Sequence, residues 1–195
     1  MVLHVLLVVG AVLVGAPVAS ASSTLKWSGE AAKTSRGWDN ASNWEAGVIP
    51  SSSEPVALEF PTLTSANCTS SPPTDTCYES ENDVNGLDVE SLQVEDSQTY
   101  LIAGKQIALG GGGLTVAPTT KTTAQTGSIL AMPIALGVAQ TWNIAGQNGD
   151  KAIDGNQFVL LEEVSGAGHS LNVKLSEGGG LVLANEDELG SLSLE

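Results

Sequence analysis

Few residues of this chain have the types and spacing that catalysis requires. Asp150 and Asp154 lie four residues apart, and two carboxylates can act as general acid and general base in glycoside hydrolysis. Each also stands next to a glycine, where aspartate is a common turn former. His169 precedes Ser170, but adjacent residues of a strand point to opposite faces, so Ser170 is not a natural partner for this imidazole. We therefore predict no catalytic activity, with a polysaccharide-degrading enzyme as the alternative.

A second set of residues suggests binding. Trp27, Trp38 and Trp44 fall in one short segment rich in Gly and Asn, in a chain with only four tryptophans. If these rings are exposed, Trp38 and Trp44 form a sugar-binding platform with Asp39 and Asn43 as polar neighbours. If they are buried, the rings plug the end of a hydrophobic core. We favour the plug and keep the carbohydrate-binding platform as the alternative.

The sequence predicts a disulfide and no cofactor. Cys68 and Cys77 are the only cysteines, and an even count in an exported chain favours a bridge between them. A single histidine after residue 21 cannot assemble a zinc site. Seven acidic residues between Glu79 and Asp96 match no calcium-loop motif, so we interpret them as a solvated face. The glycine run 110–113 fits no phosphate-binding loop.

The N-terminus has the features of a signal peptide. An apolar run precedes Pro17, and Ala19-Ser20-Ala21 has the form that signal peptidase cleaves, which places residues 1–21 in the signal peptide and cleavage before Ser22. A membrane anchor that stays attached is the alternative. No later stretch is apolar and long enough to span a membrane. We expect the mature chain to be secreted or located at the cell surface.

The net charge limits the partners. A formal charge of −15 repels nucleic acids and anionic lipids, so neither is an expected partner. An extracellular glycan, a matrix component or a component of the cell envelope remains compatible with this charge.

The elements that must position these residues are short strands. Apolar triplets recur at 92–94, 114–116, 134–136, 158–160 and 181–183, at intervals of 22, 20, 24 and 23 residues. Gly, Asn, Asp and Thr fill most gaps between them, as is typical of turns between strands. The spacing matches one coil of a right-handed parallel β-helix, or β-solenoid, in which coils stack around a narrow aliphatic core. A β-sandwich is the alternative.

This interpretation divides the chain into three parts. Residues 1–21 form the signal peptide, residues 22–85 an irregular Trp-rich N-terminal cap with the disulfide-clipped loop, and residues 86–195 the coils. A β-helix needs such a cap because its first coil otherwise exposes apolar side chains and unpaired strand edges.

Several short motifs together carry a family resemblance. They are WSG (27–29), GWDNASNW (37–44), GVIP (47–50), VALEF (56–60), YLIAGKQIALGGGGLTV (100–116), AQTWNI (139–144) and GGGLVL (178–183). In these motifs the chain resembles the N-terminal part of exported passenger-type proteins with autotransporter-associated β-strand repeats. The resemblance implies a right-handed β-helical passenger, and it implies no particular activity. Such chains continue for many coils, so we expect either a truncated chain or a last coil that a partner covers. The predicted function is an exported structural or adhesion-type passenger segment.

Overall fold

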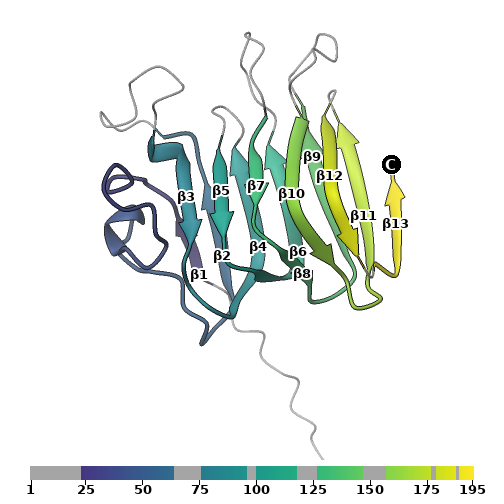
Figure 1. The fold of residues 1–195 in the computed structure, drawn as a ribbon, viewed down its shortest axis with the longest axis horizontal. Coiled ribbons are helices and arrows are strands. Elements are labelled where there is room, and N and C mark those ends of the chain that lie inside the picture. Colours follow the sequence, from purple (N-terminus) through teal and green to yellow (C-terminus); the bar gives the residue numbers. More distant parts are fainter. Residues whose placement is uncertain are drawn as a thin grey trace, which may run out of the picture.

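The computed structural model describes residues 23–63, 76–95, 100–117, 127–146, 157–176, 179–187 and 189–195. Its strands belong to one 13-stranded hydrogen-bonded system in which the paired strands run parallel (Figure 1). The described residues contain no α-helix, and two 3-10 helices, η1 (Ala41–Asn43) and η3 (Thr76–Tyr78), interrupt the strands. The predicted parallel β-solenoid is confirmed. The β-sandwich alternative is wrong, because it requires two facing antiparallel sheets.

The solenoid has three stacks of strands. The first stack contains β3 (Glu79–Asn82), β5 (Leu101–Gly104), β7 (Ile129–Ala131) and the first parts of β10 (Gln157–Ser165) and β12 (Gly180–Asp187). These strands form the front row in Figure 1. Their rungs follow one another along the long axis, from the dark cap end to the yellow C-terminal end.

The second and third stacks share their long strands. They begin with the short strands β1 (Ser23–Lys26) and β2 (Val56–Phe60) and continue with the long strands β4 (Leu87–Glu95) and β6 (Ile107–Ala117). One end of β6 pairs with β8 (Ile134–Leu136), which then pairs with the last part of β10. The other end of β6 pairs with β9 (Gln140–Ala145), and β11 (Ser170–Ser176) and β13 (Ser191–Leu194) continue that stack. Each long strand therefore turns a corner of the solenoid.

The core consists of ladders of apolar side chains, most of them aliphatic, one from each coil. The registers align Ile102, Leu130 and Leu160 in the first stack, Leu87, Ile107, Ile134 and Val164 in the second, and Phe60, Val94, Val116 and Ile144 in the third, all of them buried. Branched and aromatic side chains pack well on a pleated surface, which explains the strands. Backbone pairing between coils satisfies the polar groups, while the ladders exclude water.

The cap is an insertion within the stack. We call residues 27–55, which lie between β1 and β2, the cap loop. Strand stacking begins before Gly86, since β1, β2 and β3 of segment 22–85 already pair as rungs. The cap loop closes the N-terminal end of the tube (Figure 1).

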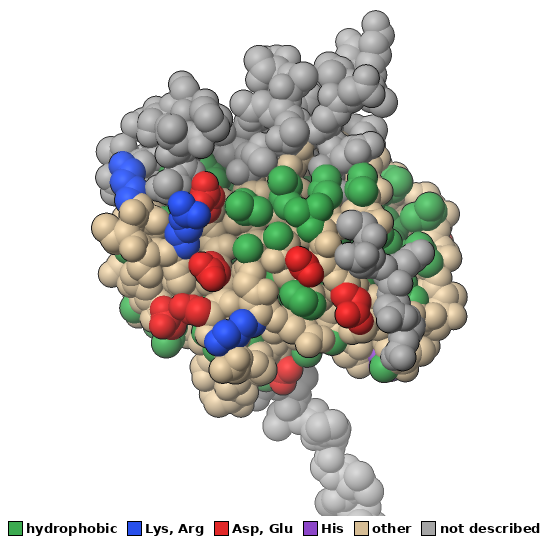
Figure 2. All heavy atoms as spheres, in the orientation of Figure 1, with side chains coloured by type: hydrophobic (Ala, Val, Ile, Leu, Met, Phe, Trp, Pro, Cys, Tyr) green, Lys and Arg blue, Asp and Glu red, His purple; other side chains and the backbone are tan. Residues whose placement is uncertain are grey.

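The outer surface is uneven in chemistry. In the view of Figure 2, hydrophobic side chains gather over the middle of the row of strands, and the Lys and Arg side chains of this face lie toward the cap end. No helix in the described part of the chain has the length and apolar character needed to cross a bilayer.

Candidate functional site

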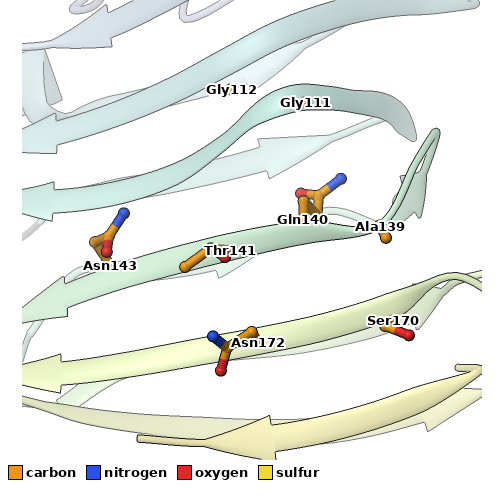
Figure 3. Close-up of a pocket in the computed structure, with 8 residues that line it drawn as sticks. All are labelled: Gly111, Gly112, Ala139, Gln140, Thr141, Asn143, Ser170 and Asn172. Atoms are coloured by element: carbon orange, nitrogen blue, oxygen red, sulfur yellow. The ribbon is translucent and has the colours of Figure 1, made fainter.

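A polar groove of about 520 Å³ lies on the outside of the solenoid, where β6, β9 and β11 run side by side (Figure 3). We call it the outer groove. It is lined by Gly111 and Gly112 of β6, by Ala139, Gln140, Thr141 and Asn143 at and along β9, and by Ser170 and Asn172 of β11.

The groove exists because β6 bulges outward at three glycines. The register with β4 pairs Leu109 with Val89 and Gly113 with Ser91, so Glu90 alone faces Gly110, Gly111 and Gly112. We call residues 110–112 the glycine arch. The pairing of β6 with β8 covers residues 107–109 and that with β9 covers 115–116, so the arch lies outside both ladders. β6 visibly curves away from β9 there (Figure 3).

The close approach of the neighbouring coil explains why this segment is glycine. A Cβ at Gly112 would lie 2.6 Å from the Ser91 Cβ and 2.7 Å from the Glu90 carbonyl oxygen. A Cβ at Gly111 would meet only the Val138 Cγ2, at 3.7 Å, because this residue faces the open groove. The arch therefore brings backbone rather than side chains to one wall of the groove.

Gln140 fixes the floor of the groove. Its side chain is buried, and its Nε2 donates to the carbonyl oxygens of Leu109 at 2.9 Å and Val138 at 3.4 Å. Its Oε1 accepts a hydrogen bond from the Trp142 indole at 2.8 Å. These bonds use both ends of the amide, so Gln140 holds β9 in place beneath the arch.

The side chains that point outward beside the arch are uncharged and polar. Thr141 and Asn143 alternate with the buried Trp142 along β9, and Asn172 pairs in register with Thr141 across the coils. The Ser193 hydroxyl donates to the Asn172 Oδ1 at 3.0 Å. Hydroxyl and amide groups at these positions both donate and accept hydrogen bonds.

The three cap tryptophans do not form an exposed platform. Trp27 and Trp38 are 0 % exposed and Trp44 is 2 % exposed. They pack with Phe60 at centroid distances between 5.8 and 6.3 Å, and Phe60 in turn contacts Tyr100 at 5.5 Å. The rings plug the N-terminal end of the core, so Trp38 and Trp44 offer no face to a sugar.

Asn43 is a structural centre of the cap. It is fully buried, and its Oδ1 accepts from the Ala31 N–H at 3.0 Å. Its Nδ2 donates to the carbonyl oxygens of Ser35 at 2.8 Å and Gly37 at 3.1 Å. One side chain thus ties three points of the cap loop together, and its hydrogen-bonding groups are not available to a ligand.

Asp39 lies against a second carboxylate. Its backbone N–H donates to the Asp83 Oδ1 at 2.9 Å, and the Lys105 ammonium donates to the Asp83 carbonyl oxygen at 2.6 Å. A side-chain hydrogen bond with the Asp83 carboxyl group, and then the negative charge of Asp83, raise the pKa of the Asp39 carboxyl above its usual value. Asp39 therefore belongs to a carboxylate pair between the cap loop and the first coils.

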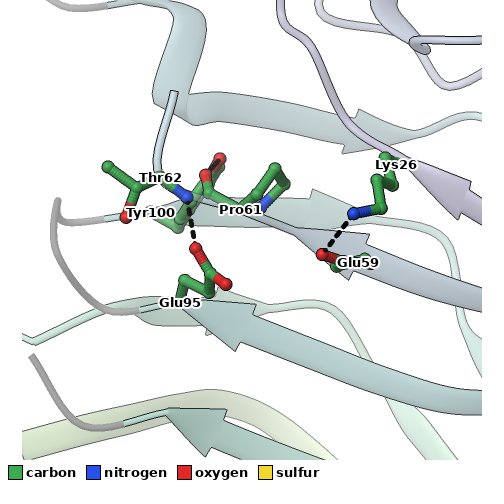
Figure 4. A network of polar contacts seen from close by, with 6 residues as sticks. All are labelled: Lys26, Glu59, Pro61, Thr62, Glu95 and Tyr100. Carbon is green, nitrogen blue, oxygen red and sulfur yellow. Dashed lines mark hydrogen bonds and ion pairs between the residues drawn. The ribbon is translucent and has the colours of Figure 1, made fainter. Parts of the chain in front are cut away.

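Polar contacts also join the first coils beside the cap (Figure 4). Lys26 and Glu59 form an ion pair at 2.9 Å, and the Thr62 N–H donates to the Glu95 carboxylate, also at 2.9 Å. The Tyr100 hydroxyl donates to the Pro61 carbonyl oxygen at 2.5 Å. Burial, with smaller contributions from Tyr78 and Glu95, raises the pKa of Tyr100, so its phenol remains a donor.

Some of the predicted residues lie outside the described part of the chain. These are residues 1–21, Cys68, Asp150 and Asp154. Cys77 is buried beneath the cap, and the disulfide with Cys68 stays a prediction. Ser170 lies at the groove, and the backbone N–H of its neighbour His169 donates to the Gly166 carbonyl oxygen in a turn.

Most of the groove residues were not among the site residues that the sequence predicted. The sequence does not show which strands pair, and the groove residues Gln140, Asn143 and Asn172 come from two different coils. The alternation of polar and buried residues after the glycine run could have indicated a polar outer surface there. Among the described residues, no three His, Cys, Asp or Glu side chains form a group able to hold a metal ion.

Comparisons with known proteins found no match, whether to protein-family descriptions, to curated proteins or to solved structures.

Proposed function

We propose that this protein is an exported structural module of the adhesion type, with no catalytic activity of its own. The observation that supports this is the continuous aliphatic core, built of stacked ladders and closed at one end by buried aromatic rings. In a solenoid each coil is stabilised by its neighbours, so the fold provides an extended surface of fixed shape. Such a surface suits repeated contact with extracellular material.

Export is supported by the predicted signal peptide in residues 1–21 and by the resemblance to passenger-type proteins with autotransporter-associated β-strand repeats. The net charge of −15 disfavours nucleic acids and anionic lipids and keeps the chain soluble in the medium. We therefore propose a secreted or cell-surface location, with a glycan, matrix or envelope component as the partner.

Bead adhesion tests this proposal. Beads coated with the secreted full chain are passed over surfaces coated with extracellular matrix or cell-envelope material, and albumin-coated beads serve as the control. We expect greater retention of the chain-coated beads and a decrease in retention when soluble chain is added. Retention equal to that of albumin-coated beads on every surface would overturn the proposal.

A parallel assay separates the enzymatic alternative. The chain is incubated with polysaccharides, and newly formed reducing ends are measured. Sustained release of reducing ends that is lost in the Asp150→Asn, Asp154→Asn double variant would replace the adhesion module with a hydrolase. No release above that of the double variant is the expected result.

A further inference from the structure

We propose that the outer groove binds an uncharged glycan chain. This inference rests on the proposed adhesion function and deepens it, because it names the class of ligand and the residues that bind it. The argument depends on the shape of the groove, the chemistry of its lining and its charge.

The groove is open to solvent rather than a closed cavity. The glycine arch forms one wall, and the outward side chains of β9 and β11 form the rest. A groove of about 520 Å³ that is open to solvent can accommodate a few sugar units of a longer chain. A compact cofactor would bury most of its surface in a deeper pocket.

The lining offers hydrogen-bonding groups in a regular array. Thr141 and Asn172 are paired across adjacent coils, which are about 4.8 Å apart in a sheet. Thr141 and Asn143 lie two residues apart on one strand, a separation of about 6.6 Å. Hydroxyl groups recur along a sugar chain, and each can donate to and accept from an amide or a hydroxyl.

The array is preorganised. Gln140 is held by three hydrogen bonds, and Trp142 beneath it is fully buried. Asn172 is oriented by the Ser193 hydroxyl. A ligand therefore meets a fixed floor and oriented side chains, which lowers the entropy lost on binding.

Charge selects the uncharged class of glycan. None of the described residues that line the groove carries a charge, although the chain as a whole carries −15. Glu90 lies opposite the arch on β4. Lys174 of β11 lies next to Asn143 of β9 in the strand register, beside the groove. A polyuronate or sulfated glycan would find no cation in the lining, and the overall charge would repel it.

Affinity electrophoresis tests the inference. The secreted full chain is run through native gels that contain graded amounts of mixed-linkage β-glucan, galactomannan or dextran, with polygalacturonate as the acidic counterpart. We expect at least one neutral polysaccharide to retard the protein, which gives a dissociation constant. Polygalacturonate should cause no retardation.

Three variants locate the site. The Asn143→Ala, Asn172→Ala double variant removes two amides, and we expect it to raise the dissociation constant at least tenfold. Gly111→Leu should fill the groove and cause a similar loss, since a Cβ at this position meets only Val138 and a larger side chain therefore extends into the open groove. Gln93→Ala is the matched control, because Gln93 is an exposed amide on the same stack outside the groove lining.

The outcomes separate this inference from the proposed function. The site is supported if both groove variants lose retardation while Gln93→Ala keeps it. The melting temperatures of all variants must remain unchanged. Three outcomes would overturn the inference. The groove variants could be retarded as much as the parent, polygalacturonate alone could retard the protein, or none of the neutral polysaccharides could retard it. In those three cases bead adhesion that persists leaves the adhesion module standing with another contact surface.

Discussion

Trp27 and Trp44 meet edge to face, with ring centroids 5.4 Å apart and ring planes at 88°. Their backbones form an isolated antiparallel bridge, in contrast to the parallel strand pairs of the solenoid. The chain therefore reverses direction within the cap loop and places two indoles over the end of the core. Edge-to-face packing of this kind adds about 0.5–1.5 kcal/mol to the hydrophobic contribution of each pair.

Replacing the cap tryptophans one at a time with phenylalanine should separate ring packing from hydrogen bonding. The Trp27 indole donates to the Cys77 carbonyl oxygen and the Trp44 indole to that of Trp38, whereas the buried Trp38 Nε1 has no partner among the described residues. We expect Trp27→Phe and Trp44→Phe to lower the free energy of unfolding by about 1–2 kcal/mol more than Trp38→Phe, because each removes a buried hydrogen bond that Trp38 does not make. Urea unfolding followed by circular dichroism measures this. A larger loss in Trp38→Phe would contradict the assignment.

Asn43→Asp should destabilise the cap in a pH-dependent way. A carboxylate at this position would face the carbonyl oxygens of Ser35 and Gly37 without a proton to donate, in a fully buried site. We expect a loss of about 3 kcal/mol or more at pH 7, with partial recovery in acid, where the protonated carboxyl donates again. Chemical unfolding at pH 4 and pH 7 measures both effects.

Asn40→Ala is the control for that variant. The Asn40 side chain caps η1 by accepting from the Ser42 N–H at an exposed site. We expect a loss of about 1 kcal/mol that does not change with pH. Equal losses in Asn43→Asp and Asn40→Ala would show that the cap does not depend on the buried amide.

The Asp39–Asp83 pair should make the cap more stable in mild acid than at neutral pH. Asp83 raises the pKa of Asp39, so between the unfolded and the folded pKa the native state binds more protons than the unfolded state. Stability from this group is therefore present at low pH and is lost as the pH rises through the folded pKa. We expect Asp39→Asn to flatten this part of the stability profile, which urea unfolding at a series of pH values above 3.8 measures. An unchanged profile would show that another group is responsible.

Alanine substitutions at two positions of the glycine run, Gly111 and Gly113, should differ sharply in their effect on stability. Gly113 has a φ of +62°, and a Cβ there would lie 2.5 Å from the Thr141 carbonyl oxygen. The left-handed conformation alone costs an alanine about 1–2 kcal/mol, and the close contact adds to that cost. Gly111→Ala meets no such contact, so we expect a change within about 0.5 kcal/mol. Thermal unfolding of the two variants compares them, and similar losses would mean that the arch has a different shape.

The aliphatic triplets predicted the fold class correctly, but their regular spacing was misleading in detail. The triplets 114–116 and 134–136 belong to different stacks, since Val116 pairs with Ile144 and Ile134 with Ile107. Along the third stack the partners are 22 residues apart from Leu92 to Leu114 and 28 from Val116 to Ile144. Extra residues between rungs lengthen some coils, and an average interval cannot show where they are inserted.

The cap was predictable and the groove was not, for one physical reason. Burial of large rings follows from residue type, so Trp27, Trp38 and Trp44 indicated a plug without knowledge of their contacts. The groove depends on which residues of separate coils lie side by side, such as Thr141 and Asn172. The alternation of buried and exposed residues excludes a shift of one residue, which would turn each outward side chain into the core. That alternation does not show which residues of separate coils are partners, so the pairs that line the groove could not be predicted.

The aromatic plug also constrains the order in which the chain can fold. Trp27 finds its hydrogen-bond acceptor at Cys77, fifty residues later, and Phe60 packs against Tyr100. A polypeptide that emerges from its N-terminus first therefore cannot complete these contacts until about a hundred residues have been released. These non-local contacts make the closed end of the solenoid depend on segments that follow it in the sequence, and contacts of this kind slow folding.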